Sequence, residues 1–228
     1  MIEDLPAKRS QKKTSKDYSR CFTIERHKTA LLIVDMQYAS ASRLAGLGRE
    51  MTFKDSKNLD WRFERIENLV IPNIQRLLTF FRRNKMPVIY VVIRSQRKDY
   101  SDMPLHMRSR ARGGPETREA EILDELRPEP TDLVLSKTTI SAFTSTNLDT
   151  SLKALGVEYL VFTGVSTNVC VDTTARDAAD RGYRCVVLDD ACAAIYEKKY
   201  HNFALSLFGE RFGRVENTAN ILAELANE

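Results

Sequence analysis

The sequence predicts a three-layer α/β fold, in which a mostly parallel, doubly wound sheet of six strands carries helices on both faces. Two observations lead to this prediction. Continuous apolar runs recur along the chain, as expected of strands that are buried on both faces of a parallel sheet. Amphipathic segments of helical period alternate with these runs, and strands that alternate with helices form βαβ crossovers.

The expected elements follow from this alternation. Apolar runs predict strands at 29–37, 87–94, 159–165 and 183–190, and weaker patterns predict strands at 131–137 and about 211–215. Helical periodicity predicts helices at 62–84, 147–155, 168–181, 197–208 and 217–226. Pro72 should kink or break the first of these helices, because proline lacks the N–H that a helix interior needs. Residues 38–59 and 96–116 are expected as long loops, which in a compact domain usually act as lids or binding loops.

Length and composition favour one globular domain. A chain of 228 residues with 43% hydrophobic and 29% charged residues suits a single α/β core. The chain has neither an apolar run near the ~20 residues needed to span a bilayer nor an N-terminal signal peptide, so we expect a cytoplasmic protein with no membrane partner. We divide the chain into an extended or partly disordered leader at 1–24 and one domain at 25–228.

The net charge of +4 is concentrated in the leader. Residues 1–20 hold six basic and three acidic residues, so the rest of the chain is almost neutral. A short basic segment of this kind is more often a solvated tail than a nucleic-acid-binding arm. We therefore expect no nucleic-acid partner, although deletion of residues 1–20 would test that alternative.

Polar residues at the ends of the predicted strands define a candidate site. Ligands in doubly wound sheets bind beyond the carboxyl ends of the strands, near the point where strand order reverses. The residues expected there are Asp35, Arg94, Lys137, the segment 166–170, and the pair Asp189 and Asp190.

Cys170 differs from the other three cysteines in its position. It lies at the start of a predicted helix, where the helix dipole and unpaired backbone N–H groups favour a thiolate nucleophile. A free cysteine is more often a small buried hydrophobe, and Cys185 and Cys192 fit that description. No CxxC pair is present, so we expect reduced thiols in a cytosolic chain.

Asp35 and Lys137 each end an apolar strand. A buried charge without a partner costs several kcal/mol, so each residue either caps a neighbouring segment or pairs with the other. If they meet beside Cys170, the three side chains supply a base, a cation and a nucleophile.

Three segments of the sequence resemble the signature blocks of the isochorismatase-like cysteine hydrolases. They are ALLIVDMQ, SKTTISAF and TGVSTNVCVDTTARDAADRGY, in that order. The resemblance implies a Cys–Asp–Lys triad of Cys170, Asp35 and Lys137, which hydrolyses amides through a thioester. It also implies a cis peptide bond between Val165 and Ser166, an oxyanion hole formed by the backbone N–H groups of Ser166 and Cys170, and a homo-oligomer (dimer or tetramer).

Departures from the family pattern narrow the implied activity. The three histidines lack the Asp-x-His-x-x-His spacing of the nicotinamidase metal site, so no metal or other cofactor is implied. The vinyl-ether-cleaving isochorismatases lack the cysteine that this chain keeps. The remaining resemblance is to hydrolases of small amides and carbamoyl compounds. Alternatives are a metal-free nicotinamidase-like or isochorismatase-like hydrolase, and a non-catalytic binding protein on the same fold.

Further residues are candidates for the substrate pocket. Arg94 and the arginines of 96–116 are suited to bind a substrate carboxylate through paired hydrogen bonds. The aromatic candidates are Tyr38, Trp61, Phe143 and Tyr196. An activated Cys170 should react with iodoacetamide well below pH 8.5, whereas equal reactivity of all four cysteines would favour the binding protein.

Overall fold

The computed structural model describes residues 21–52 and 60–228 and confirms the predicted α/β architecture. In this part of the chain, six parallel strands form one sheet in the order β3-β2-β1-β4-β5-β6. The chain runs from β1 outward to β3 and then returns to β4 on the other side of β1. Strand order therefore reverses between β1 and β4, and the carboxyl ends of these two strands flank the expected ligand site.

The strands are close to their predicted positions. They are β1 (Thr29–Val34), β2 (Val88–Ile93), β3 (Leu133–Lys137), β4 (Tyr159–Val165), β5 (Arg184–Ala193) and β6 (Arg214–Glu216). Every residue of β1 and β4 is buried, which explains why these two segments are continuously apolar.

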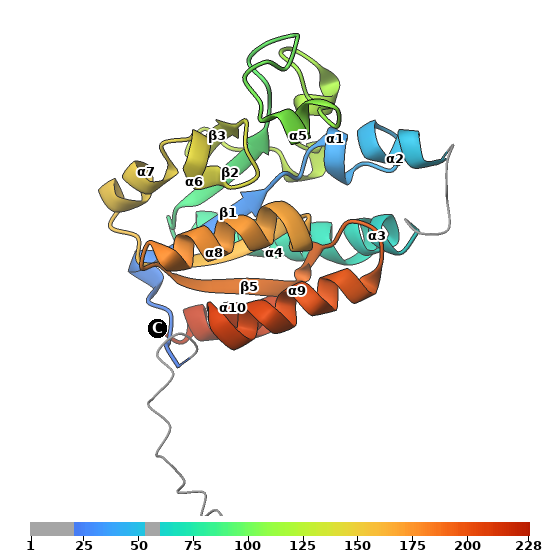
Figure 1. The fold of residues 1–228 in the computed structure, drawn as a ribbon. Coiled ribbons are helices and arrows are strands. Elements are labelled where there is room, and N and C mark those ends of the chain that lie inside the picture. The colour runs from blue at the N-terminus through green and yellow to red at the C-terminus, as the bar shows by residue number, and fades with distance from the viewer. Residues whose placement is uncertain (1–20, 53–59) are drawn as a thin grey trace, which may run out of the picture.

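Helices cover both faces of the sheet (Figure 1). The helices are α1 (Tyr38–Ala41), α2 (Gly46–Thr52), α3 (Asp60–Arg65), α4 (Ile71–Arg83), α5 (Leu105–Arg108), α6 (Ala142–Ser145), α7 (Leu148–Ala154), α8 (Asp172–Asp180), α9 (Lys198–Arg211) and α10 (Thr218–Ala226). Single 3₁₀ turns occur at Arg26–Lys28, Arg118–Ala120 and Asp124–Leu126.

Two apolar cores lie on opposite faces of the sheet, because side chains alternate along each strand. Leu31 and Ile33 of β1 face the core formed with α3, α4 and α10. Leu32 and Val34 face the core formed with α6, α7, α8 and α9, and Cys170 belongs to this second core. The nucleophile candidate thus lies at the edge of a packed apolar layer.

The first long helix differs from its prediction. The chain stays helical from Asp60 to Arg83, and the break expected at Pro72 is replaced by a π-helical segment at Ile66–Val70. Pro72 lies within the first two positions of α4, immediately after that segment. A π-helical turn shifts the hydrogen bonds by one residue, so it accommodates a proline that would otherwise interrupt the helix.

The end of β5 also differs from its prediction. The strand continues to Ala193 instead of ending at 190, and its pairing with β4 shifts register between Phe162 and Gly164. Asp189, Asp190 and Cys192 therefore lie within a bulged strand rather than beyond its end. A bulge redirects side chains locally, which matters for the network described below.

Two boundaries need correction. Phe22 and Ile24 belong to the folded domain rather than to the leader, since Phe22 packs against Tyr159 and Ile24 is buried. The expected loop at 38–59 contains α1 and α2, and 96–116 contains α5. The leader prediction for residues 1–20 lies outside the described residues, as does the segment 53–59.

Candidate active site

Three predicted residues meet at the carboxyl edge of the sheet. Asp35 follows β1, Lys137 is the last residue of β3, and Cys170 lies in a π-helical turn (Thr167–Val171) after β4. The Lys137 Nζ lies 3.0 Å from Oδ2 of Asp35 and 3.4 Å from Sγ of Cys170. It also donates a hydrogen bond of 3.1 Å to the carbonyl oxygen of Thr139. One ammonium group thus connects the carboxylate to the thiol.

These three groups are removed from water. Lys137 is fully buried, Asp35 is 2% exposed and Cys170 is 9% exposed. Burial alone would lower the pKa of Lys137, but the negative charges of Asp35 and of the Cys170 thiolate outweigh it and raise this pKa. The contacts of Lys137 therefore favour its charged form, as a buried ion pair requires.

The surroundings of Cys170 oppose the thiolate that its place at a helix start led us to expect. Burial, reinforced by the negative charge of Asp35, raises its pKa to about 12, although Lys137 opposes the change. The desolvation of the thiolate outweighs the effect of backbone N–H groups in the turn. A group that removes the proton during attack is therefore needed. Oδ1 of Asp35 is a suitable acceptor, because it is buried and has no hydrogen-bond partner among the described residues.

The turn that carries Cys170 begins at a close contact between β1 and β4. Gly164 has a φ of +105°, and a Cβ at this position would lie 2.1 Å from the carbonyl oxygen of Val34. Only glycine fits such an approach. The next peptide bond, between Val165 and Ser166, is cis in the structure. The close contact at Gly164 holds the turn of Cys170 beside the residue that follows Val34, which is Asp35.

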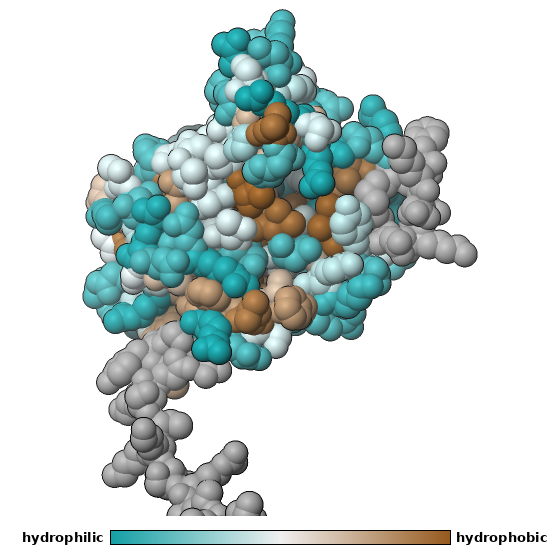
Figure 2. All heavy atoms as spheres, in the orientation of Figure 1, coloured by the Kyte–Doolittle hydropathy of each residue, from teal (hydrophilic) through white to brown (hydrophobic). Residues whose placement is uncertain are grey.

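A cavity of about 420 Å³ opens above these residues. Figure 2 shows apolar side chains gathered in a hollow of this face, below the loop that contains α5. Asp35, Ser166 and Cys170 line the cavity, and Met103, Met107 and Ile140 add apolar surface. A small organic molecule fits a cavity of this size.

Only one of the five predicted pocket residues, Tyr196, lines this cavity among the described residues. The Tyr38 hydroxyl donates to Asp124, and the Arg118 guanidinium covers the Tyr38 ring. Trp61 packs against His201. These contacts hold both aromatic rings away from the reacting groups.

Arg94 and Phe143 also point elsewhere. Arg94 donates a hydrogen bond to the carbonyl oxygen of Ala120. Phe143 is buried against the ring of Tyr183, and Arg181 covers its face. Both residues follow strand ends in sequence, but their side chains fill the core and a neighbouring loop.

Arg62 is a site residue that the sequence reasoning missed. It is fully buried and lines the cavity, and its Nη1 donates to Oγ of Ser166 (3.1 Å) and to the carbonyl oxygen of Ala194 (2.7 Å). Nη2 donates to the carbonyl oxygen of Ser40 (2.7 Å). Burial lowers its pKa to about 10, and the charge of Cys170 opposes that change. The sequence spacing could have identified Arg62, because it lies four residues before Ile66 and therefore on the apolar face of the helix.

The remaining cysteines do not line this cavity, and His106 is the one histidine among the described residues that does. Cys185 and Cys192 are fully buried, and burial raises both of their pKa values, whereas Cys21 is exposed. Among the described residues, no cluster of His, Cys, Asp or Glu side chains is arranged to hold a metal ion. No helix in 21–52 or 60–228 is both long and apolar enough to span a bilayer.

Comparison with known proteins identifies the family. The model of the isochorismatase domain matches residues 29–220, which include Asp35, Lys137 and Cys170. The chain belongs to the isochorismatase family. Solved structures of isochorismatase-like proteins agree with this assignment. A cysteine hydrolase from Pseudomonas syringae pv. phaseolicola is 26% identical with a TM-score of 0.76, over 90% of this chain and 96% of that one.

Other isochorismatase-family relatives bear names that specify a reaction. A ureidoacrylate amidohydrolase from Acinetobacter baylyi is 31% identical over 85% of this chain and 82% of that protein. A homologue of the same name from Methylobacterium radiotolerans is 44% identical, but the match spans only 43% of this chain and 38% of the homologue. The N-carbamoylsarcosine amidase from Thermoplasma acidophilum is 28% identical with a TM-score of 0.64, over 84% of this chain and 96% of that one.

Proposed function

We propose that this isochorismatase-family protein hydrolyses a C–N bond of a small amide or ureido compound, with Cys170 as the nucleophile. The observation that carries the proposal is the contact of one buried ammonium, that of Lys137, with both the Asp35 carboxylate and the Cys170 sulfur. The relatives named ureidoacrylate amidohydrolase and N-carbamoylsarcosine amidase support the same reaction class.

The first half of the reaction forms a thioester. Asp35 takes the proton from Cys170 as the sulfur attacks the carbonyl carbon, so that a neutral thiol of high pKa becomes reactive only when substrate is present. The negative charge moves to the carbonyl oxygen, which the backbone N–H groups of Ser166 and Cys170 would stabilise. The C–N bond then breaks, and Asp35 returns the proton to the leaving nitrogen.

The second half releases the acid. Water attacks the thioester carbon, Asp35 accepts a proton from that water, and the sulfur leaves and is reprotonated. Lys137 keeps its charge throughout and stabilises each negatively charged species in turn. Arg62 adds a second buried cation, whose interaction with a charged Cys170 favours the thiolate.

The cavity favours a substrate that carries a carboxylate. Arg62 and Arg110 line it, as does Arg112, whose charge is paired with Glu50, whereas Asp35 is the one carboxylate among its lining residues in the described part of the chain. A positive excess in a partly enclosed cavity attracts anions and raises their local concentration. We therefore propose ureido acids and carbamoyl amino acids as the first compounds to examine.

The test is ammonia release from a panel of ureido acids, N-carbamoyl amino acids and small primary amides. Cys170→Ala should abolish turnover of the best substrate and leave a folded protein, whereas Cys21→Ala, which removes an exposed thiol, should retain it. Acid-quenched wild-type enzyme should carry the acyl group on Cys170 by intact-mass analysis. Turnover retained by Cys170→Ala would refute the mechanism.

We also propose a cytoplasmic homo-oligomer. The free thiols of Cys170, Cys185 and Cys192 suit a reducing compartment. Leu44, Leu105 and Phe203 are 81%, 80% and 71% exposed, and burial of such side chains between subunits would stabilise an oligomer. Light scattering coupled to size-exclusion chromatography would detect a dimer or tetramer, and a monomer at micromolar concentration would contradict the proposal.

A further inference from the structure

A buried hydrogen-bond chain connects the nucleophile turn to the surface at Asp189. Thr167, the first residue of the turn, places its Oγ1 2.8 Å from Nδ1 of His201 on α9. Nε2 of His201 lies 2.8 Å from Oδ1 of Asp189, in the bulged part of β5. Thr167 and His201 are each 1% exposed, whereas the side chain of Asp189 is 55% exposed.

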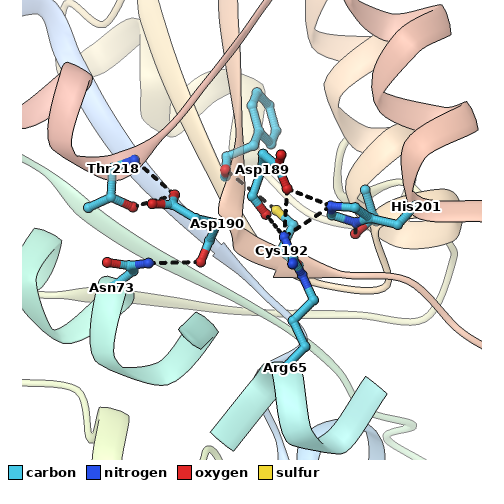
Figure 3. A network of polar contacts seen from close by, with 9 residues as sticks. Arg65, Asn73, Asp189, Asp190, Cys192, His201 and Thr218 are labelled. Atoms are coloured by element: carbon cyan, nitrogen blue, oxygen red, sulfur yellow. Dashed lines mark hydrogen bonds and ion pairs between the residues drawn. The ribbon is translucent and has the colours of Figure 1, made fainter. Parts of the chain in front are cut away.

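Arg65 holds the outer end of this chain (Figure 3). Its Nη2 donates to Oδ1 of Asp189 (2.6 Å) and to the carbonyl oxygen of Asp189 (2.7 Å), and its Nε donates to the carbonyl oxygen of Cys192 (2.9 Å). The neighbouring Asp190 is turned the other way and accepts hydrogen bonds from Thr218. Because successive side chains of a strand point to opposite faces, Asp189 contacts His201 on α9 and Asp190 contacts Thr218 on α10.

The partners determine which nitrogen of His201 carries the proton. The pKa of Asp189 is lowered, chiefly by its hydrogen bond with His201, so Asp189 is an ionised carboxylate and can only accept. Nε2 of His201 lies 2.8 Å from this carboxylate and 3.2 Å from Nη2 of Arg65, and the shorter contact assigns the N–H to Nε2, which leaves Nδ1 as an acceptor. The hydroxyl of Thr167 therefore donates to Nδ1. Both hydrogen bonds, from Thr167 to His201 and from His201 to Asp189, are thus donated toward Asp189.

We propose that His201 is a positioning residue for the nucleophile. Its neutral ring, fixed by Asp189, accepts the Thr167 hydrogen bond and thereby holds the turn that presents Cys170. Protonation of His201 would convert Nδ1 into a donor, so the Thr167 hydroxyl would have to rotate and accept, which alters the contact that holds the turn. His201 touches neither substrate nor the reacting atoms, so it acts through Thr167 alone.

The charged groups around His201 keep the ring neutral. Burial lowers the pKa of His201, Arg65 on α3 and Lys198 on α9 add to this effect, and Asp189 on β5 opposes it. Trp61 packs against the ring without charge. The sum places the pKa of His201 below its ordinary value of 6.5, so the ring is unprotonated at neutral pH.

The first experiment does not depend on finding a substrate. Nitrogen-15 NMR of the inactive Cys170→Ala protein reports the tautomer and titration of each of the three histidines, and His201→Phe assigns the signal of residue 201. We expect a neutral ring with its proton on Nε2 at pH 7. Asp189→Asn should move the His201 titration to lower pH, and Arg65→Gln should move it to higher pH. A charged ring at pH 7, or a proton on Nδ1, would overturn the proposal.

The second experiment links the histidine to Cys170. Thr167→Val removes the donor without changing side-chain size, and Thr167→Ser keeps it as a matched control. We expect Thr167→Val and His201→Phe each to lower kcat by about 10- to 100-fold with little change in KM, because misplacement of a reacting group affects the chemical step. The double variant should be no worse than either single one, since both remove the same contact.

The pH profile distinguishes positioning from a structural role. The acidic limb of kcat should shift with the His201 titration in Asp189→Asn and Arg65→Gln, in opposite directions, and should disappear in His201→Phe. Equal loss of activity at every pH would refute the positioning role while leaving the hydrolase intact. Only the kinetic measurements depend on the proposed hydrolase function, whereas the NMR experiment does not. If no hydrolysis is found, the same variants should change the rate of Cys170 alkylation instead.

Discussion

The ammonium of Lys137 lies 3.0 Å from the Asp35 carboxylate, and both groups are almost completely shielded from solvent. Lys137 comes from β3 and Asp35 follows β1, so β2 separates them in the sheet. The long lysine side chain spans this distance and reaches Cys170 as well. The site therefore combines a buried charge pair with a thiol whose pKa is raised by burial. This arrangement makes separate predictions for each of the three groups.

Asp35→Asn should make Cys170 more reactive toward alkylation and less active in turnover. The Asp35 charge raises the pKa of Cys170, so its removal should lower that pKa from about 12 and increase the thiolate fraction at pH 9. Turnover should fall by about 10²- to 10⁴-fold, because the proton shuttle is lost. The pH dependence of iodoacetamide modification at Cys170, followed by mass spectrometry, measures the first effect. The buried Cys185 and Cys192 serve as internal controls. Slower alkylation than in wild type would contradict the electrostatic assignment.

Lys137→Met should destabilise the fold more than an ordinary core substitution. It leaves the Asp35 carboxylate buried without its partner, which costs about 3–5 kcal/mol. Adding Asp35→Asn to Lys137→Met should restore most of the stability, because neither buried charge remains. Urea denaturation of both proteins provides the comparison. If the double variant is as unstable as Lys137→Met, packing and not charge pairing explains the loss.

The site shows which features could be predicted from sequence. Asp35, Lys137 and Cys170 could be found because each ends or follows an apolar strand, and parallel strands bring their carboxyl ends to one edge. Their protonation could not be predicted, since the pKa of Cys170 depends on burial by residues from other parts of the chain. The approach of β1 to β4 depends similarly on Gly164, whose φ is unusual only in the folded structure.

Most residues that line the cavity could not be predicted from the sequence, because tertiary contacts decide where their side chains point. Tyr38 and Phe143 follow strand ends as Asp35 does, yet local turns direct their rings toward Arg118 and Arg181. Met103 and Met107, which do line the cavity, come from a loop with no periodic pattern. The position of such a loop is determined by tertiary contacts, so its side chains cannot be assigned to a pocket from sequence.

Arg110→Gln should reduce selectivity for substrates that carry a carboxylate. Arg110 lines the cavity, and loss of a hydrogen bond to a charged group costs about 1.5–3 kcal/mol, or roughly 10- to 150-fold in kcat/KM. The neutral carboxamide of the same substrate should be affected much less. Arg97→Gln is the matched control, because Arg97 belongs to the same loop but pairs with Asp99. An equal loss with acid and carboxamide would exclude carboxylate recognition by Arg110.

Gly164→Ala should destabilise the protein far more than Gly182→Ala. Both glycines have positive φ, +105° and +93°, so an alanine at either position pays the conformational cost of the left-handed region, about 1–2 kcal/mol. At Gly182 a Cβ meets no atom within 4 Å, whereas at Gly164 it meets the Val34 carbonyl oxygen at 2.1 Å. Relief of this clash requires β1 and β4 to separate, which would also move Asp35 away from Cys170. Gly164→Ala should therefore differ from Gly182→Ala both in its thermal unfolding midpoint and in the rate of Cys170 alkylation. Similar unfolding midpoints would show that the strands tolerate the extra methyl group.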